Sequence, residues 1–110
     1  MSEVFEVIWT RSAVLDLDEI LAYIVAERSV DQAGLIYETL RMRTASLETM
    51  PRRGRQVPEL RDIGLYEYRE MIEGPYRLIF RIIDRKVVLL GVLDSRRDLE
   101  ELLVQRAIDR

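Results

Sequence analysis

The chain contains no cysteine and no histidine, and among its seventeen basic residues only Lys86 is a lysine. Without cysteine, disulfides and thiolate metal sites are excluded. Without histidine, the chain lacks the commonest general acid and base near neutral pH and also the commonest metal ligand. These absences narrow the enzymatic chemistry that the chain can perform, and we expect neither a metal site nor a cofactor.

A long apolar run and an excess of positive charge are also missing. No run approaches the roughly 20 residues needed to span a bilayer, and residues 1–6 lack the basic and apolar regions of a secretory leader. We therefore expect a soluble, cytoplasmic protein. The net charge of −3 argues against a general nucleic-acid binder. With 110 residues, 48% of them hydrophobic, residues 1–110 are expected to form a single domain.

Apolar periodicity predicts seven elements in the order strand, helix, helix, strand, strand, strand, helix. Alternation predicts a strand over residues 4–9, and Thr10 is a candidate N-cap for the helix that follows. Ser29 and Gln32 match a capping box that begins a second helix, which Pro51 ends. Paired helices on one face of a small, mainly antiparallel sheet predict an α+β fold. The other expected elements are strands at 66–73, 76–81 and 87–93 and a short helix from Leu99 to Ala107.

The last two strands form the most regular part of the sequence. Residues 76–81 alternate, whereas residues 87–93 are almost continuously apolar, as expected for a central strand that is covered on both faces. Gly91 within that strand predicts close helix packing or a β-bulge. The strand is followed by Arg96 and Arg97, so the hairpin is expected to present two cations at the edge of the sheet.

An irregular surface loop is predicted between Pro51 and Leu65, because two prolines and a glycine interrupt any periodic pattern. Elsewhere, Trp9 and Tyr23 are expected to pack between sheet and helix. The acidic residues of the first helix are expected to face water and not to bind a metal. Those acidic residues are Asp16, Asp18 and Glu19, and the cations of the loop are Arg52, Arg53, Arg55 and Arg61.

An ordered set of motifs over nearly the whole chain resembles the RelE/ParE superfamily of bacterial type II toxins, and is closer to ParE. The set comprises Trp9-Thr10 with the apolar positions of the first helix, Pro51-x-x-Gly54-Arg55-x-Val57-Pro58-Glu59-Leu60, the run 76–81 and Arg96-Arg97-Asp98. Such toxins are encoded beside an antitoxin whose C-terminal segment folds on the toxin. The resemblance therefore implies a cognate antitoxin, which would meet the two N-terminal helices and the sheet edge and would alone contact operator DNA.

RelE-type members of the superfamily cut mRNA in the ribosomal A site. The chain has some of the residues that these nucleases use and lacks others. Arg77 and Arg97 fall where such nucleases keep phosphate-stabilising arginines. The positions expected to supply lysines hold Tyr68 and Glu70, and the position expected to hold tyrosine or histidine is Leu103. The groups that transfer protons are therefore missing. The residues that could replace the missing proton-transfer groups are Tyr66, Tyr68 and Glu70.

Arg77 and Arg81 also have a purely structural interpretation. Both belong to a predicted strand, where they can lie on the solvent side of the sheet and pair with Glu67 or Glu73. Exposed pairs of that kind contribute little, roughly 0–1 kcal/mol each. The sequence leaves this interpretation and the phosphate-binding one open.

ParE-type members share the fold but poison DNA gyrase, so the resemblance to ParE implies growth inhibition by binding, without cleavage. Two alternatives remain: a ribosome-dependent mRNA endonuclease of RelE type, and an inactive homologue that serves as a protein-binding module in a repressor complex. The candidate target-binding residues are Arg52, Arg53, Arg55, Arg96 and Arg97.

Overall fold

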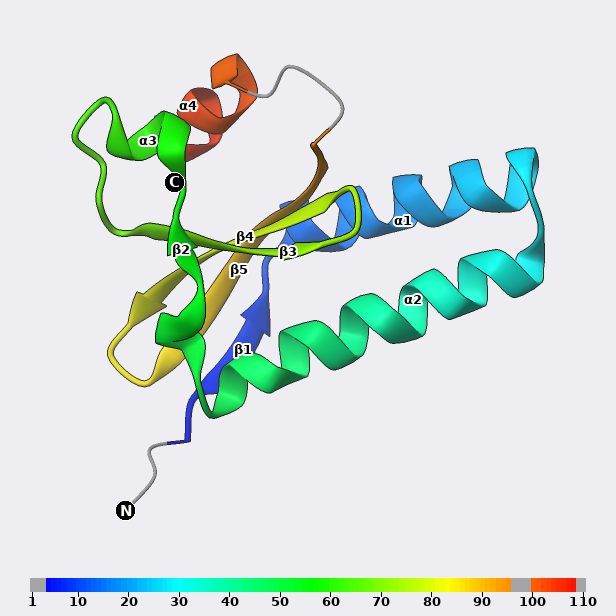
Figure 1. Ribbon diagram of the computed structural model, residues 1–110, viewed down its shortest axis with the longest axis horizontal. Helices are drawn as coiled ribbons and strands as arrows, with labels where there is room; N and C mark the ends of the chain where they lie inside the picture. The colour runs from blue at the N-terminus through cyan, green and yellow to red at the C-terminus, as the bar shows by residue number, and fades with distance from the viewer. Residues whose placement is uncertain (1–3, 96–99, 109–110) are drawn as a thin grey trace.

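The computed structural model describes residues 4–95 and 100–108, which form a sheet with helices on both faces (Figure 1). The predicted element order is confirmed, with a short strand and a helical turn added after the second helix. The helices are α1 (Arg11–Glu27), α2 (Val30–Ala45), α3 (Pro58–Arg61) and α4 (Glu100–Ile108), with 3₁₀ helices η1 (Ser46–Glu48) and η2 (Pro51–Arg53). The strands are β1 (Glu6–Trp9), β2 (Arg55–Gln56), β3 (Tyr68–Glu73), β4 (Tyr76–Ile83) and β5 (Lys86–Asp94). Within the described ranges, no helix is both long enough and apolar enough to cross a membrane.

The five strands form one mixed sheet in the order β1-β5-β4-β3-β2. β1 runs parallel to β5, and the other neighbouring strands are antiparallel. The β4–β5 hairpin lies at the centre, with Tyr76 opposite Asp94 at one end and Ile83 opposite Lys86 at the other. The predicted α+β fold with a mainly antiparallel sheet is confirmed.

A β-bulge interrupts the β4–β5 ladder. Ile79 lies opposite Gly91, but the next residue, Phe80, lies opposite Leu89, so Leu90 is the extra residue. Consequently the alternation shifts by one residue, because Val87 and Leu89 join the larger apolar cluster before the bulge and Val92 joins it after the bulge. The irregularity predicted at Gly91 is confirmed.

Side-chain caps begin both long helices, as predicted. The hydroxyl oxygen of Thr10 accepts from the N–H of Ala13 at 3.2 Å, and the same hydroxyl donates to the carbonyl of Leu89 at 2.8 Å. The hydroxyl oxygen of Ser29 accepts from the N–H of Gln32 at 3.0 Å. The first cap therefore also fixes the start of α1 to β5.

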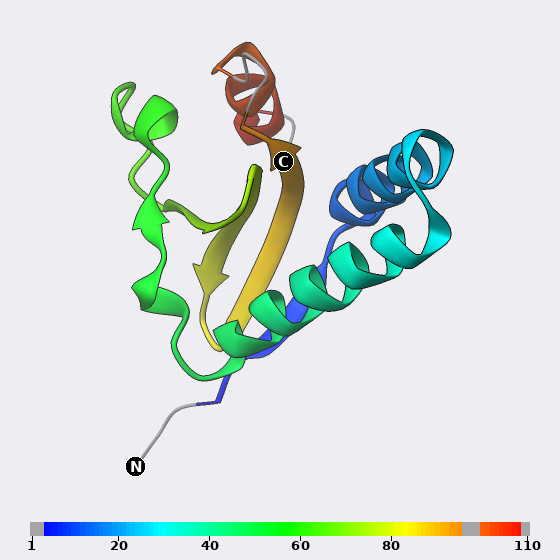
Figure 2. The same ribbon diagram turned by 45° about the vertical axis from the view of Figure 1, so that its right-hand side comes forward.

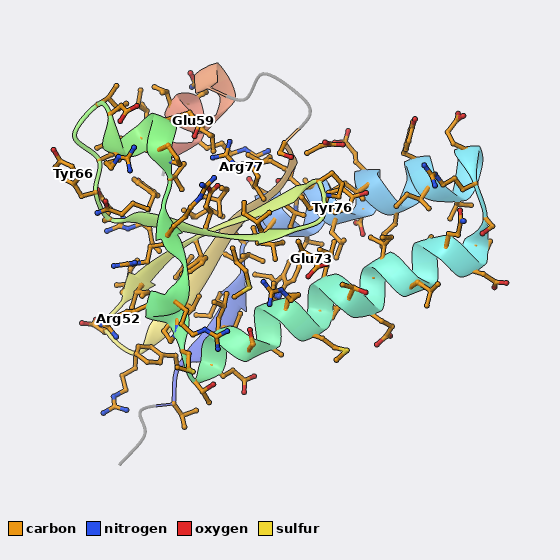
Figure 3. The ribbon with its side chains drawn as sticks, in the orientation of Figure 1. Arg52, Glu59, Tyr66, Glu73, Tyr76 and Arg77 are labelled. Carbon is orange, nitrogen blue, oxygen red and sulfur yellow. The ribbon has the colours of Figure 1, made fainter. Side chains whose placement is uncertain are left out.

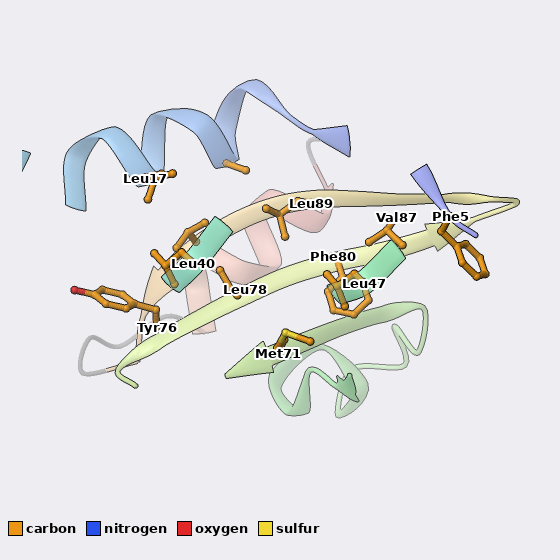
Figure 4. Close-up of a cluster of buried hydrophobic side chains, with 12 residues drawn as sticks. Phe5, Leu17, Leu40, Leu47, Met71, Tyr76, Leu78, Phe80, Val87 and Leu89 are labelled. Carbon is orange, nitrogen blue, oxygen red and sulfur yellow. The ribbon is translucent and has the colours of Figure 1, made fainter. Parts of the chain in front are cut away.

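The two long helices cover one face of the sheet, here called the α1/α2 face, and enclose the larger core (Figures 2 and 4). Leu40 of α2 lies beside Leu78 of β4 in this cluster, and Leu47 of η1 lies beside Phe80. Gly54 lies against the aromatic ring, because a Cβ there would come within 2.6 Å of the Phe80 ring. Full burial of each such side chain contributes roughly 1.5–3 kcal/mol. The α1/α2 face is therefore the main source of stability.

The opposite face, here called the α3/α4 face, holds a smaller apolar cluster. Leu60 of α3 and Leu103 of α4 are almost completely buried against Tyr68, Ile79 and Leu90 of the sheet. The two short helices depend on this cluster, because a four-residue helix such as α3 has little intrinsic stability.

The prediction of an irregular loop over residues 51–65 is wrong in part, because β2 and α3 lie within it. Pro58 occupies the first turn of α3, where a proline costs no hydrogen bond, so this proline begins regular structure and does not prevent it. The N–H of Val57 donates to the carbonyl of Tyr68 at 3.0 Å and fastens the segment to β3. Tertiary contacts therefore order a segment that has no periodic pattern of its own.

The two aromatic residues expected between sheet and helix have different environments. Trp9 is half-buried and packs against the larger core, as predicted. Tyr23 is 64% exposed, so its predicted burial is wrong. Its neighbour Ile24 takes the position that faces the core, and the helix hairpin diverges from the sheet toward its turn (Figure 2).

Candidate functional site

Four charged side chains form an ion-pair network on the α3/α4 face. Two of them, Glu59 and Arg77, are labelled in Figure 3. Nη1 and Nη2 of Arg77 donate to Oε2 and Oε1 of Glu59, both at 2.7 Å, and Nε of Arg77 donates to Oε1 of Glu70 at 2.6 Å. Oε2 of Glu70 accepts from Nε of Arg55 at 2.7 Å. The side chain of Arg77 is 8% exposed and that of Glu70 is 0% exposed. The centre of the network is therefore shielded from water.

Adjacent elements bring the four residues together. Glu70 lies opposite Ile79, and Ile79 is two residues from Arg77, so Glu70 and Arg77 project from the same face of neighbouring strands. Arg55 lies opposite Glu70 in the β2–β3 ladder. Glu59 comes from α3, which lies over this face. The network thus ties the β2–α3 segment to the centre of the sheet.

The network also stabilises the charged forms of Glu59 and Arg77. The hydrogen bonds from Arg77 hold the pKa of Glu59 below its ordinary value of 4.5, although partial burial acts in the opposite direction. The hydrogen bonds to Glu59 raise the pKa of Arg77. The guanidinium faces a carboxylate with the forked geometry that also suits a phosphate. Glu59 therefore occupies the part of Arg77 that an anionic ligand would need.

The interpretation of Arg77 as a surface residue is wrong. Its partners are Glu59 and Glu70, and not Glu67 or Glu73. The sequence singled out Glu59 only as part of a motif, although a proline at a helix start followed by Glu is a sign of a short helix that presents a carboxylate. The role of Glu59 becomes visible only when α3 lies over the sheet.

Of the three candidate substitutes for a proton-transfer group, Glu70 contacts Arg77, and it does so as an ion-pair partner. Tyr68 is buried, its hydroxyl donates to the carbonyl of Ala107 at 3.4 Å, and the guanidinium of Arg81 lies 5.6 Å from the centre of its ring. Glu70 is buried within the ion-pair network. Tyr66 is 61% exposed in the segment before β3. The site therefore holds a structural cation and no adjacent acid–base pair among these three residues.

A second ion pair fastens α4 to α1. Nη1 and Nη2 of Arg106 donate to Oδ2 and Oδ1 of Asp16 at 2.7 and 2.9 Å, and these bonds raise the pKa of Arg106. Gly91 leaves room for the pair, because a Cβ there would lie 2.7 Å from Nη1 of Arg106 and 3.1 Å from Oδ2 of Asp16. The expectation that Asp16 faces water is wrong, whereas Asp18 and Glu19 are exposed as expected.

Three of the five arginines predicted to bind a target lie within the described residues. Arg52 and Arg53 are exposed on η2, near the start of β1 (Figure 3). Arg55 is 60% exposed but its Nε belongs to the ion-pair network. Arg96 and Arg97 lie outside the described residues. The roles of these five residues remain predictions.

An apolar groove of about 670 Å³ opens between the helix hairpin and the start of β4. Ile20 and Ile24 of α1, Ile36 of α2 and Tyr76 of β4 line it, and Glu19 contributes a charge. Further apolar side chains are exposed on the same two helices, outside most of the apolar stripe that the sequence predicted. These are Val14, Leu15, Tyr23, Val25, Val30, Leu35, Tyr37 and Met42.

Comparisons with known proteins identify relatives of this fold. The model of the family described as "ParE toxin of type II toxin-antitoxin system, parDE" matches residues 7–99. The solved chromosomal ParDE system from P. aeruginosa contains a similar chain with 20% identity and a TM-score of 0.70, covering 83% of this chain and 96% of that one. The toxin–antitoxin complex RelBE2 from Mycobacterium tuberculosis has 24% identity and a TM-score of 0.58, covering 84% and 92%. No curated protein sequence matches the chain.

Proposed function

Because the chain belongs to the family of ParE toxins of type II toxin–antitoxin systems, we propose that it inhibits DNA gyrase and is neutralised by direct binding of a cognate antitoxin. The main observation in support of this proposal is that Arg77 is already ion-paired with Glu59 and Glu70. The one described arginine at a phosphate-binding position of RelE-type nucleases is engaged within the chain. Inhibition by binding requires no such free cation.

The geometry disfavours the alternative of an mRNA endonuclease. Cleavage by a 2′-hydroxyl needs a base, a cation for the phosphate and an acid for the leaving oxygen. To hold a phosphate, Arg77 would have to release Glu59, which it binds through two hydrogen bonds of 2.7 Å. Tyr68, which lies nearby on the same face, donates its hydroxyl proton to a backbone carbonyl. These contacts support a toxin that does not cut RNA.

The helix hairpin supports the antitoxin part of the proposal. Its groove and exposed apolar side chains form a larger apolar surface than an isolated small domain needs. An amphipathic segment that folds on binding would cover such a surface. The antitoxin would supply the DNA-binding part of the complex, since this chain has a net charge of −3.

Induction of the chain alone in a sensitive bacterium tests the proposal. Gyrase poisoning predicts growth arrest with filamentation and an SOS response, and full-length transcripts. Rapid translation arrest with transcripts cut in the ribosomal A site would instead identify a RelE-type nuclease. Normal growth with soluble protein would identify an inactive binding module. Co-expression of the neighbouring reading frame is expected to restore growth.

The role of the strand-end arginines can be tested in the same assay. We expect Arg97→Ala to weaken growth arrest, because the substitution removes the charge and the hydrogen bonds with which Arg97 would bind the target. Arg61→Ala is the matched control, since the side chain of Arg61 is exposed and pairs with the neighbouring, exposed Asp62 at 3.5 Å. Unchanged arrest by Arg97→Ala would remove Arg97 from the target-binding surface.

A further inference from the structure

Arg81 is the second arginine that β4 directs to the α3/α4 face, and its environment differs from that of Arg77. The two residues lie four positions apart on one strand, so their side chains project from the same face. Within residues 4–95 and 100–108, no hydrogen bond or ion pair reaches Arg81, and its Nε is buried without an acceptor. The pairing with Glu67 or Glu73 that the sequence suggested is not formed in these ranges. One arginine of this face is therefore held by carboxylates, and the other is not.

An aromatic contact holds Arg81 in place of an ion pair. Its guanidinium lies 5.6 Å from the ring centre of Tyr68, the residue opposite it on β3. Stacking fixes the plane of the guanidinium but leaves its donors available. Because no hydrogen bond from the described residues fixes its rotation, the guanidinium can turn on the ring and present Nε and an Nη to one oxyanion. A buried donor without an acceptor is unfavourable, so an external acceptor would be a gain for Arg81.

The strand register places Arg81 in a row of side chains across four strands. Val88 of β5 lies opposite Arg81, and Ile8 of β1 lies opposite Val88. Together with Tyr68, these side chains lie next to one another on the α3/α4 face. The side chains of Ile8, Val88 and Arg81 are half-buried. Val88 lies at the margin of the smaller apolar cluster, so the row marks where the cover of this face ends.

The charges near this row favour a single carboxylate as the ligand. In the next row toward the β4–β5 turn, Lys86 lies opposite Glu6 of β1 and Ile83 of β4. The two rows therefore contain two cations and one carboxylate. A nucleic-acid backbone is bound by several cations, whereas one arginine can bind a carboxylate through two parallel hydrogen bonds. Half-buried aliphatic side chains beside an arginine are typical of a protein interface.

We propose that the target protein, which is DNA gyrase in the proposed function, places a carboxylate side chain on Arg81 and covers the row that Arg81 forms with Ile8 and Val88. This inference rests on the proposed function, because it assigns the target a contact on this chain. The helix hairpin, where the antitoxin is proposed to bind, covers the opposite face of the sheet (Figure 2). The two partners are thus assigned to different faces.

Binding to purified gyrase holoenzyme, measured by calorimetry with and without a DNA duplex, tests the contact. Arg81→Glu should weaken binding by about tenfold or more, because a repulsive charge then faces the carboxylate of the partner. Arg61→Glu, an exposed reversal on α3, should leave affinity within about twofold. Equal affinity of the wild type and Arg81→Glu would overturn the proposal.

Two other results would give Arg81 a different partner and overturn the proposal as well. The first is wild-type binding to the DNA duplex alone that Arg81→Glu abolishes, which would identify a phosphate as the ligand. The second is a loss of affinity for the product of the neighbouring reading frame with unchanged affinity for gyrase. Absence of gyrase binding by the wild type would instead overturn the proposed function and this inference with it.

Stability separates a target contact from a structural role of Arg81. Arg81→Leu should leave the midpoint of thermal unfolding unchanged or raise it, because the substitution removes a buried donor that has no acceptor. The same variant should still bind gyrase about tenfold more weakly. Arg77→Leu, on the same strand and face, is the matched comparison and should lower the midpoint, because Glu59 and Glu70 lose their partner. A comparable loss of stability in Arg81→Leu would show that Arg81 holds the fold and would contradict the proposal.

Discussion

The two faces of the sheet are closed by different chemistry. On the α1/α2 face, aliphatic and aromatic side chains fill the space almost without polar groups. On the α3/α4 face, a smaller apolar cluster is combined with the Arg77 network, and the Asp16–Arg106 pair holds α4 beside it. Among the described residues, the charged side chains that are buried, Glu70 and Arg77, both belong to the α3/α4 face.

This difference shows what buried charge does in this fold. Apolar packing tolerates changes that conserve volume, whereas a buried ion pair tolerates loss of neither partner. The α3/α4 face also includes Arg77, the position at which a nuclease of the superfamily would bind phosphate. In this chain the pair between Glu59 and Arg77 holds α3 to the sheet.

The largest expected effect is at the centre of the α1/α2 face. Phe80→Ala should lower the free energy of unfolding by about 3–5 kcal/mol, because it leaves a large cavity beside Gly54 and Leu78. Equilibrium unfolding in guanidinium chloride measures the loss. Leu35→Ala, at a residue 69% exposed, is the control and should change stability by less than about 0.5 kcal/mol. A loss below about 1.5 kcal/mol for Phe80→Ala would mean that the two faces contribute comparably.

Removing one carboxylate tests the α3/α4 face. Glu70→Ala should destabilise the chain by about 3 kcal/mol, because Arg77 then stays buried with one partner fewer. Glu73→Ala is the matched control on the same strand, since Glu73 forms an exposed pair with Arg43 and should contribute about 0–1 kcal/mol. Equal losses from the two variants would contradict the special role of the buried network.

Replacing the charged centre as a unit sharpens the same comparison. The triple variant Glu59→Gln, Glu70→Leu, Arg77→Met should be within about 1 kcal/mol of the wild type in unfolding experiments, since no unpaired charge remains buried. Stability near that of Glu70→Ala would mean that the ion pairs themselves, and not the avoidance of an unpaired charge, stabilise this face.

A smaller effect is expected where α4 meets the sheet. Gly91→Ala should cost about 1–2 kcal/mol, because the new methyl group displaces Nη1 of Arg106 from Asp16. The cost should shrink in an Arg106→Met background, and a double-mutant cycle followed by thermal unfolding measures this coupling. Additive losses would show that the methyl group clashes with the backbone and not with the ion pair.

The smallest effect concerns pH. The pKa of Glu59 is lower in the folded chain than its ordinary value of 4.5, so its contribution is complete above that pH and is lost as pH falls through the folded pKa. Between about pH 5 and pH 3, wild-type stability should therefore fall more steeply than that of Glu59→Gln. Parallel curves from urea unfolding at each pH would show that Glu59 is not held ionised by Arg77.

The sequence predicted the parts of the fold that local patterns encode. The caps at Thr10 and Ser29 and the irregularity at Gly91 each follow from a few neighbouring residues, and all three are confirmed. The contacts that join α3 and α4 to the rest are not local. Asp16 and Arg106 lie ninety positions apart, and no periodicity links them.

The candidate site was only half visible in the sequence for the same reason. A strand position such as Arg77 can be recognised from its motif, but its burial depends on which residues cover it. Glu59 reaches Arg77 because Leu60 and Val57 fix the β2–α3 segment, and that packing exists only in the folded chain. The sequence predicted that Arg77 pairs with Glu67 or Glu73, which are close to it along the chain. Its partners in the fold are Glu59 and Glu70.

Growth arrest by the triple variant Glu59→Gln, Glu70→Leu, Arg77→Met is the most direct test of a toxin that acts without a phosphate site at Arg77. After induction in a sensitive host, with folding verified by circular dichroism, we expect arrest and an SOS response like those of the wild type and no cut transcripts. A folded triple variant that has lost toxicity, together with a wild type that cleaves mRNA, would contradict the structural role of Arg77.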